Sequence, residues 1–183
     1  SAVLAGGCAS LGGPPEWVAK GARIEEGALY GVGSIQGVTN DPLAWLMAEQ
    51  RARGAIARTL DSYVRLLAKD IASSSAKGSV DRHDEEQLLE FVQRTTTFVD
   101  LPGAEPVDRY YDERRRIHYV LVRLDKARAT HTIAELGGLS ERAREYVREH
   151  ADRLFRELND EIAKRGRPAD PDQGSEAGRG DRR

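Results

Sequence analysis

This chain of 183 residues has few of the features that would tie it to several large classes of protein. It has one cysteine, so no disulfide can form within the chain and the fold must be held by packing. It has no run near the roughly 18 apolar residues that a membrane-spanning helix needs, so any membrane attachment has to come through a lipid. Its net charge of -2 lacks the basic excess typical of proteins that bind nucleic acid, and no such partner is expected.

The single cysteine, Cys8, follows a short apolar stretch rich in small residues at positions 1–7. This pattern is typical of the end of a bacterial lipoprotein signal peptide, where the chain is cut just before a cysteine that becomes acylated. Each buried CH₂ contributes roughly 0.8 kcal/mol, so several acyl chains, palmitate among them, anchor a protein stably. Residues 1–8 are therefore interpreted as the remnant of a signal that ends at the lipid attachment site. The alternative is an ordinary, unmodified cysteine.

Composition separates both ends of the chain from its middle. Residues 9–16 are small, glycine-rich and proline-containing, which predicts a flexible tether. Residues 166–183 contain no large apolar side chain, so they cannot offset the entropy of ordering and are expected to be disordered. Residues 17–165 are enough for one core and predict a single domain.

The middle of the chain predicts an α+β fold, in which a small antiparallel sheet of about three strands packs on a long helix and a carboxy-terminal helix follows. Residues 41–73 carry apolar side chains every three or four positions, which indicates one long helix, with Asp41 expected to cap its start. Residues 105–112 and 116–125 predict a hairpin with an exposed, charged turn, and the second strand is apolar on both faces, as expected of a central strand. A strand near 28–37, a short helix near 84–92 and a final helix from Ser140 to about Gly166 complete the prediction.

The strand near 28–37 contains Gly31, Gly33 and Gly37. This spacing is superficially like a dinucleotide-binding loop, but the third glycine is one place late and the parallel βαβ context is missing. We expect instead that the glycines let the strand lie close to the long helix, and no cofactor is predicted.

The four histidines do not form a recognisable metal site. His83, His118, His131 and His150 lie in different predicted elements, without the spacing of zinc ligands. His118, on the central strand, is interpreted as a structural histidine. No base accompanies Cys8, and a hydrolase would need two perturbed carboxylates in one pocket. Hence no metal, cofactor or catalytic residue is predicted, and the chain is not expected to be an enzyme.

The final helix carries an apolar stripe that includes Leu154 and Leu158 among charges of both signs. If the long helix already covers the sheet, this stripe is free to contact a neighbouring copy of the chain or another envelope protein. The alternative function is a periplasmic ligand-binding module. In that case Arg109, the tyrosines next to it and the loop from Gly31 to Gly37 hold a small anion or glycan.

Several short segments, taken in order, carry a family resemblance. They are PEWV at 15–18 soon after the cysteine, LYGVG at 29–33, the alanine spacing at 48, 52 and 57 in the long helix, and YVLVRLD at 119–125. Together they resemble the LPP-twenty family of small bacterial outer-membrane lipoproteins, to which lipoproteins of the flagellar outer-membrane ring are related. The resemblance covers about residues 8–125.

The resemblance implies a compact α+β domain with no known enzymatic activity. It also implies a lipid-anchored protein at the periplasmic face of the outer membrane, with a structural or assembly role that in the related ring lipoproteins concerns the flagellum. Ala9 and Ser10 after the cysteine lack the aspartate associated with retention in the inner membrane, which favours the outer membrane by analogy.

Overall fold

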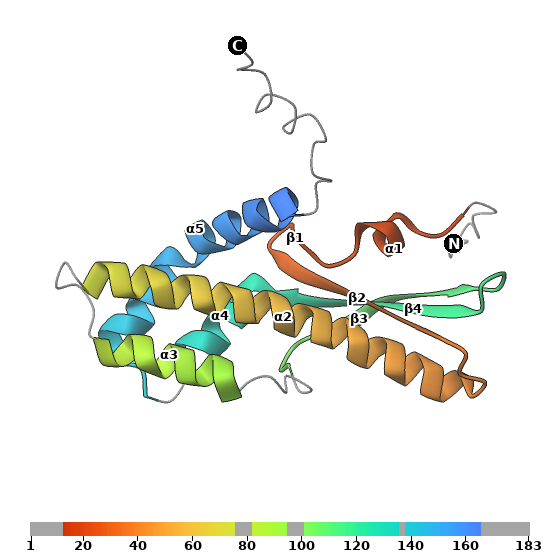
Figure 1. Ribbon diagram of the computed structural model, residues 1–183, viewed down its shortest axis with the longest axis horizontal. Coiled ribbons are helices and arrows are strands. Elements are labelled where there is room, and N and C mark those ends of the chain that lie inside the picture. Colours follow the sequence, from red (N-terminus) through yellow and green to blue (C-terminus); the bar gives the residue numbers. More distant parts are fainter. Residues whose placement is uncertain (1–12, 76–81, 95–100, 136–137, 166–183) are drawn as a thin grey trace, which may run out of the picture.

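The computed structural model describes residues 13–75, 82–94, 101–135 and 138–165 (Figure 1). The predicted signal remnant at 1–8, the first part of the predicted tether at 9–16 and the tail from 166 onward lie outside the described residues, while Glu16, at the end of that tether, begins a helix. The elements, in chain order, are α1 (Glu16–Lys20), β1 (Arg23–Glu25), β2 (Ala28–Gln36), α2 (Asp41–Ser75), α3 (Arg82–Arg94), β3 (Glu105–Asp112), β4 (Ile117–Asp125), α4 (Lys126–Ala134) and α5 (Glu141–Arg165). The fold is α+β, as predicted, with one antiparallel sheet of four strands in the order β1-β2-β4-β3.

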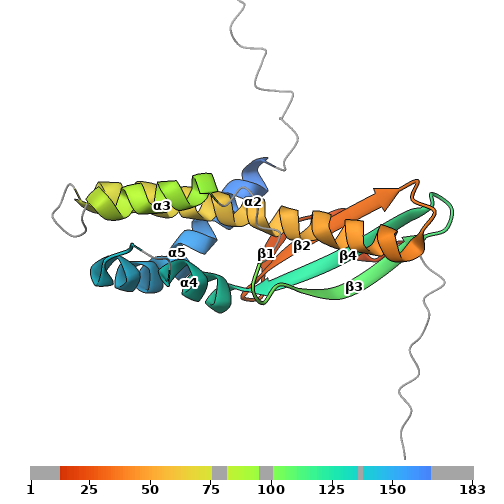
Figure 2. The ribbon, with the colours of Figure 1, turned by 90° about the horizontal axis from the view of Figure 1, so that it is seen from below.

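The long helix α2 joins a sheet half of the molecule to a helical half. Its 35 residues span about 52 Å at 1.5 Å per residue. The amino-terminal part of α2 lies across one face of the sheet and contacts β2 and β4 (Figures 1 and 2). The carboxy-terminal part extends beyond the sheet, where α3 and α5 pack against it and α4 packs against α5.

Two glycines of β2 let the sheet approach the backbone of α2. A Cβ atom added at Gly31 would lie 2.1 Å from the carbonyl oxygen of Ala52. One added at Gly33 would lie 2.1 Å from the carbonyl oxygen of Ala48 and 2.3 Å from the amide nitrogen of Ala52. Because the obstructing atoms belong to the backbone, only glycine fits at these two positions. The prediction that these glycines bring strand and helix together is confirmed.

The central position predicted for the second hairpin strand is also confirmed, because β4 pairs with β2 on one side and β3 on the other. On the face toward α2, Val120 and Val122 are fully buried. On the opposite face, Trp17 of α1 is buried and its Nε1 donates a hydrogen bond of 2.8 Å to Asp108 Oδ2 of β3. Trp17 thereby holds the start of the described chain on the sheet.

The core of the helical half is formed by α2 and α5. The ring of Tyr63 stacks on that of Phe155, with centroids 4.0 Å apart, and both side chains are buried. Leu154 and Leu158 are 0% and 2% exposed. The prediction that they form a surface for self-association is wrong, because α5 folds back onto α2, α4 and β1 and its apolar stripe fills the core of the same chain.

Two polar contacts fix α5 to the other helices. The buried carboxylate of Asp84 in α3 accepts hydrogen bonds of 2.8 Å from both the amide and the hydroxyl of Ser140, at the start of α5. Asp70 of α2 accepts a hydrogen bond of 2.6 Å from the Tyr146 hydroxyl and another from Arg153. Burial acts to raise the pKa of Asp70, but these two hydrogen bonds, together with the electrostatic effect of Arg153 and His150, outweigh it and the pKa lies below its usual value.

Candidate functional site

A pocket of about 370 Å³ opens at the end of the sheet, where β2 leads into α2 and β3 turns into β4. We call it the sheet-end pocket. It lies toward the right-hand end of the molecule in Figure 1, where the hairpin turn and the start of α2 are found. Its lining residues come from the β2–α2 loop, the start of α2, the two hairpin strands and their turn; they are Gln36, Gly37, Val38, Thr39, Asp41, Tyr111, Arg115, Arg116 and His118.

The loop between β2 and α2 sets one wall of this pocket. Gly37 has a φ of 79°, the left-handed region that favours glycine, and turns the chain out of the strand. Asn40 then caps α2, because its Oδ1 accepts a hydrogen bond of 3.0 Å from the amide of Leu43. The prediction that Asp41 caps the helix is wrong, since Asp41 is the first helical residue and its carboxylate faces His118 instead.

His118 is held in the back wall of the pocket and is only 5% exposed. Its Nε2 lies 3.4 Å from Oδ1 of Asp41. The ring of Trp45 meets it edge-on, with centroids 4.6 Å apart, and the ring of Tyr111 lies 4.5 Å away. His118 therefore has a fixed place in the sheet, and its ring also forms part of a polar cavity.

The hairpin turn supplies two arginines. Arg115 is positioned by its backbone: its amide donates to Asp112 Oδ1 (3.0 Å) and its carbonyl accepts from Gln36 Nε2 (2.9 Å). Arg115 Nε lies 3.9 Å from Asp112 Oδ2. Arg116 has a φ of 56°, and no hydrogen bond or ion pair joins its side chain to the part of the chain that the structure describes. The turn is exposed, as predicted, and these two side chains also line the pocket.

The structure separates the residues that the sequence suggested for a ligand site. Arg109 lies outside the pocket: its Nη2 is 3.6 Å from Oε2 of Glu49 and its guanidinium lies 5.8 Å from the ring centroid of Trp45. Gly31 and Gly33 are buried under α2. Of the suggested loop and strand, Gln36, Gly37 and Tyr111 line the pocket. Sequence reasoning missed the combination of Asp41, His118 and the two arginines, although the run of arginines in the turn was visible.

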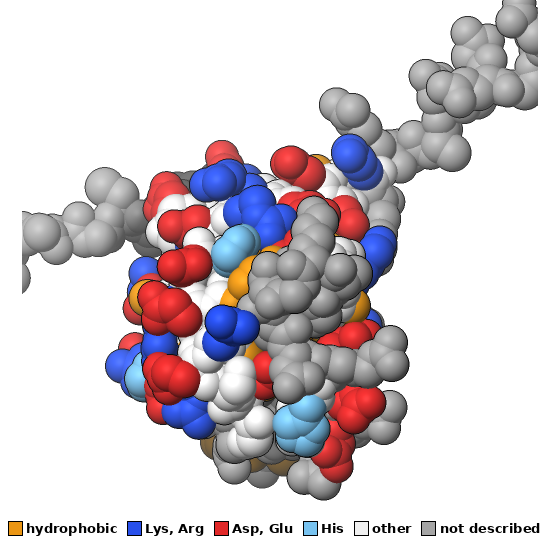
Figure 3. All heavy atoms as spheres, turned by 90° about the vertical axis from the view of Figure 1, so that its left-hand side faces the viewer, with side chains coloured by type: hydrophobic (Ala, Val, Ile, Leu, Met, Phe, Trp, Pro, Cys, Tyr) orange, Lys and Arg blue, Asp and Glu red, His pale blue; other side chains and the backbone are white. Residues whose placement is uncertain are grey.

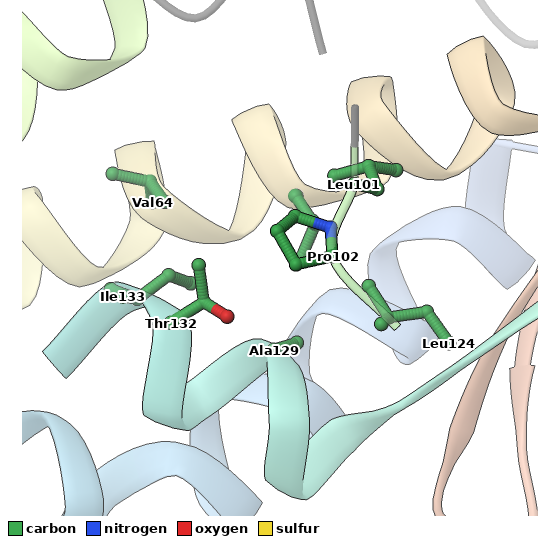
Figure 4. Close-up of a pocket in the computed structure, with 8 residues that line it drawn as sticks. Val64, Leu101, Pro102, Leu124, Ala129, Thr132 and Ile133 are labelled. Atoms are coloured by element: carbon green, nitrogen blue, oxygen red, sulfur yellow. The ribbon is translucent and has the colours of Figure 1, made fainter. Parts of the chain in front are cut away.

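Other hollows in the described residues are less suited to a ligand. Figure 4 shows an apolar crevice between α2, α4 and the turn before β3, with Val64, Leu101 and Ile133 among its walls. Its volume of about 10 Å³ holds at most a single water. A wider, open groove of about 610 Å³ lies between α4 and α5, where Lys126 and Asp152 pair with each other at 2.8 Å.

A metal site is not formed by the described residues, and the one end of the molecule drawn in Figure 3 carries charges of both signs. Within residues 13–165, apart from the gaps given above, no group of three or more His, Cys, Asp or Glu side chains is placed to hold a metal ion. The end of the molecule at the left of Figure 1 intermingles acidic and basic side chains (Figure 3). None of the described helices is both long enough and apolar enough to cross a membrane.

The fold and the pocket together define an α+β domain with a polar cavity, lined by two arginines, at the end of its sheet. A scan against known protein families gives no match, and neither does a search of the curated proteins.

Proposed function

We propose that this chain is a lipid-anchored protein of the bacterial cell envelope, with a structural or assembly role at the periplasmic face of the outer membrane. It would act without enzymatic activity, and its membrane contact would be the acyl chains on Cys8. The apolar stretch before Cys8 and the resemblance to the LPP-twenty family support the location. The surface of α2 supports the role in assembly.

The observation that carries the assembly role is an exposed apolar cluster on the first two turns of α2. Leu43, Leu46 and Met47 are 47%, 54% and 37% exposed. Their spacing of three and four residues places them on one face of the helix, and uncharged Gln50 continues that face. In a chain with 32% charged residues, such a cluster has the charge-depleted character of an interface core. We call these three side chains the α2 ridge.

A second copy of the same chain is the partner that best suits the α2 ridge. Most soluble oligomers are built from identical copies, and a two-fold axis lets one surface pair with itself. Helices pair readily in this way, because the side-chain ridges of one pack into the grooves of the other. The sheet covers the opposite side of α2, so the α2 ridge remains accessible when the chain is folded.

Light scattering on the 183-residue chain tests the assembly role. The unchanged chain should form a defined oligomer, and Leu46→Lys should convert it to a monomer with an unchanged circular dichroism spectrum. Val107→Lys is the matched control, because Val107 is also exposed but lies on β3, and this variant should remain oligomeric. A chain that is monomeric at all concentrations, or an oligomer that tolerates Leu46→Lys, would contradict self-association through the α2 ridge.

Mass spectrometry tests the anchor separately. In protein recovered from the membranes of the cells that make it, the first peptide should begin at Cys8 and carry the mass of a diacylglyceryl group and a further acyl chain. A peptide in which Val3 to Ala5 remain joined to an unmodified Cys8 would refute lipid attachment. Because the two experiments are independent, the anchor and the assembly role can fail separately.

A further inference from the structure

We infer that the sheet-end pocket binds a single sugar that carries an anionic group, a phosphate or a carboxylate. This inference is independent of the envelope role proposed above. The volume of about 370 Å³ is at the lower end of the range of small-molecule pockets, about 300–1,000 Å³. A pocket of this size suits one sugar ring rather than a nucleotide or an extended chain.

The two arginines favour an oxyanion at the mouth of the pocket. Arg115 and Arg116 bring two guanidinium groups to the lining, where the one carboxylate is that of Asp41, next to His118. Asp112, outside the lining, lies 3.9 Å from Arg115 Nε, whereas Arg116 has no such partner among the described residues. A guanidinium presents a planar fork of donors that matches the oxygens of a carboxylate or phosphate. The start of α2 adds little to this, because Pro42 has no amide hydrogen and Asn40 already accepts hydrogen bonds from the amides of Leu43 and Ala44.

The backbone of Arg116 is an independent sign that its side chain is used. A φ of 56° is a left-handed conformation, which glycine adopts readily and other residues adopt at a cost in stability. Hairpin turns usually place glycine or asparagine at such a position. An arginine that is kept there, beside a pocket and without a partner among the described residues, supports a ligand as its partner.

The rest of the lining suits a hydroxylated ring. The Asp41 carboxylate can accept hydrogen bonds from sugar hydroxyls, as can Oε1 of Gln36, whose Nε2 is already bound to the Arg115 carbonyl. The Tyr111 ring and Val38 offer apolar surface to the C–H face of a sugar. A bare phosphate ion would use only the arginines, and an apolar anion would make no use of the acceptors on Asp41 and Gln36.

Calorimetric and NMR titrations of the 183-residue chain test this inference. The probes are glucose 6-phosphate and glucuronate, with glucose and inorganic phosphate as the two halves of the expected ligand. Each anionic sugar should bind at least about tenfold more tightly than glucose or phosphate alone, since it makes both sets of contacts. The His118 ring resonances should shift on binding, because this ring lines the pocket.

Three variants in the hairpin turn assign the binding to the pocket. Arg116→Gly removes a cation from the pocket at a position whose positive φ glycine adopts readily, so the melting temperature should stay the same or rise. The same variant should bind the anionic sugars about tenfold to a hundredfold more weakly. Arg115→Gln should weaken binding to a similar extent. Arg114→Gln removes the same charge from the same turn but outside the pocket, and it should change affinity by less than about twofold.

The inference is overturned if neither anionic sugar binds, or if inorganic phosphate binds as tightly as glucose 6-phosphate. It is also overturned if Arg114→Gln weakens binding as much as Arg116→Gly, because the site would then be diffuse surface charge. Monomeric variants such as Leu46→Lys can be titrated in the same way. A failure of assembly and a failure of sugar binding are therefore distinguishable.

Discussion

Replacement of Gly33 by alanine should destabilise the protein strongly, although it adds only one methyl group. That methyl would lie 2.1 Å from the Ala48 carbonyl oxygen and 2.3 Å from the Ala52 amide nitrogen, about 1 Å closer than van der Waals contact allows. Overpacking usually costs about 1–3 kcal/mol, and here no side chain can rotate away, so we expect about 3 kcal/mol. Alanine also restricts the unfolded chain more than glycine does, and this lower entropy of the unfolded state offsets about 0.5–1 kcal/mol of the cost. The net loss is about 2–2.5 kcal/mol.

Urea denaturation followed by circular dichroism measures this loss, with Gly54→Ala as the matched control. Gly54 lies within α2, and a Cβ there would meet only Arg58 Nη1 at 3.7 Å, so the control should gain about 0.5–1 kcal/mol. The melting temperatures should move in opposite directions, down by about 5–10 °C for Gly33→Ala. Adding Ala48→Gly should not rescue Gly33→Ala, because the obstructing atoms are backbone. A Gly33→Ala protein as stable as the unchanged chain would refute the close approach of β2 and α2.

Three further predictions concern the helical half. The Tyr63 hydroxyl is buried without a hydrogen-bond partner among the described residues, and burial raises its pKa. Tyr63→Phe should therefore keep the stacking on Phe155 and leave the free energy of unfolding unchanged or higher by about 1 kcal/mol. A clear loss of stability in urea denaturation would contradict this. Asp84→Ala should lower the free energy of unfolding by about 1–3 kcal/mol, because two Ser140 donors lose their acceptor. If the effects of Asp84→Ala and Ser140→Ala simply add in the double mutant, the two side chains are not energetically coupled and this explanation is wrong. Because the pKa of Asp70 is lower in the folded than in the unfolded chain, its carboxylate stabilises the fold fully at a pH above its unfolded pKa of about 3.9. This stabilisation is lost as the pH falls through the lower pKa of the folded state. Asp70→Asn should therefore reduce the pH dependence of the unfolding free energy below about pH 4.

Elements with a strong hydrophobic period were predictable from sequence. The long helix was expected over 41–73 and is α2 (Asp41–Ser75), and the expected hairpin strands are β3 and β4. The strand β1 was missed because it has one apolar residue, Ile24, and depends on a two-residue turn in which Glu26 and Gly27 both have positive φ. The helix α4 was missed because its buried face is only Ala129 and Ile133 with the terminal Ala134, too little to stand out in the sequence.

The candidate site was harder to predict than the fold, because it depends on which segments meet. The arginine run of the hairpin turn was visible, but its neighbours across the pocket are 75 or more residues earlier in the chain, in the loop after β2. Periodicity likewise showed that Leu154 and Leu158 share a face of α5 without showing what covers that face. A stripe predicts burial, and only the three-dimensional arrangement says whether the cover comes from the same chain or from a partner.

The short reach of β1 has a consequence for how copies of this protein can join. β1 pairs only with residues 28–30 of β2, so among the described residues the stretch from Gly31 to Gln36 has a strand on one side only, that of β4. The unpaired backbone N–H and C=O groups of such a strand can pair with a strand of another chain, which leads to aggregation. Here the Arg51 guanidinium donates a hydrogen bond of 2.6 Å to the Ser34 carbonyl oxygen, which sets a charged, bulky group against this strand. We therefore expect Arg51 to hinder the addition of a strand from another chain at this edge of the sheet.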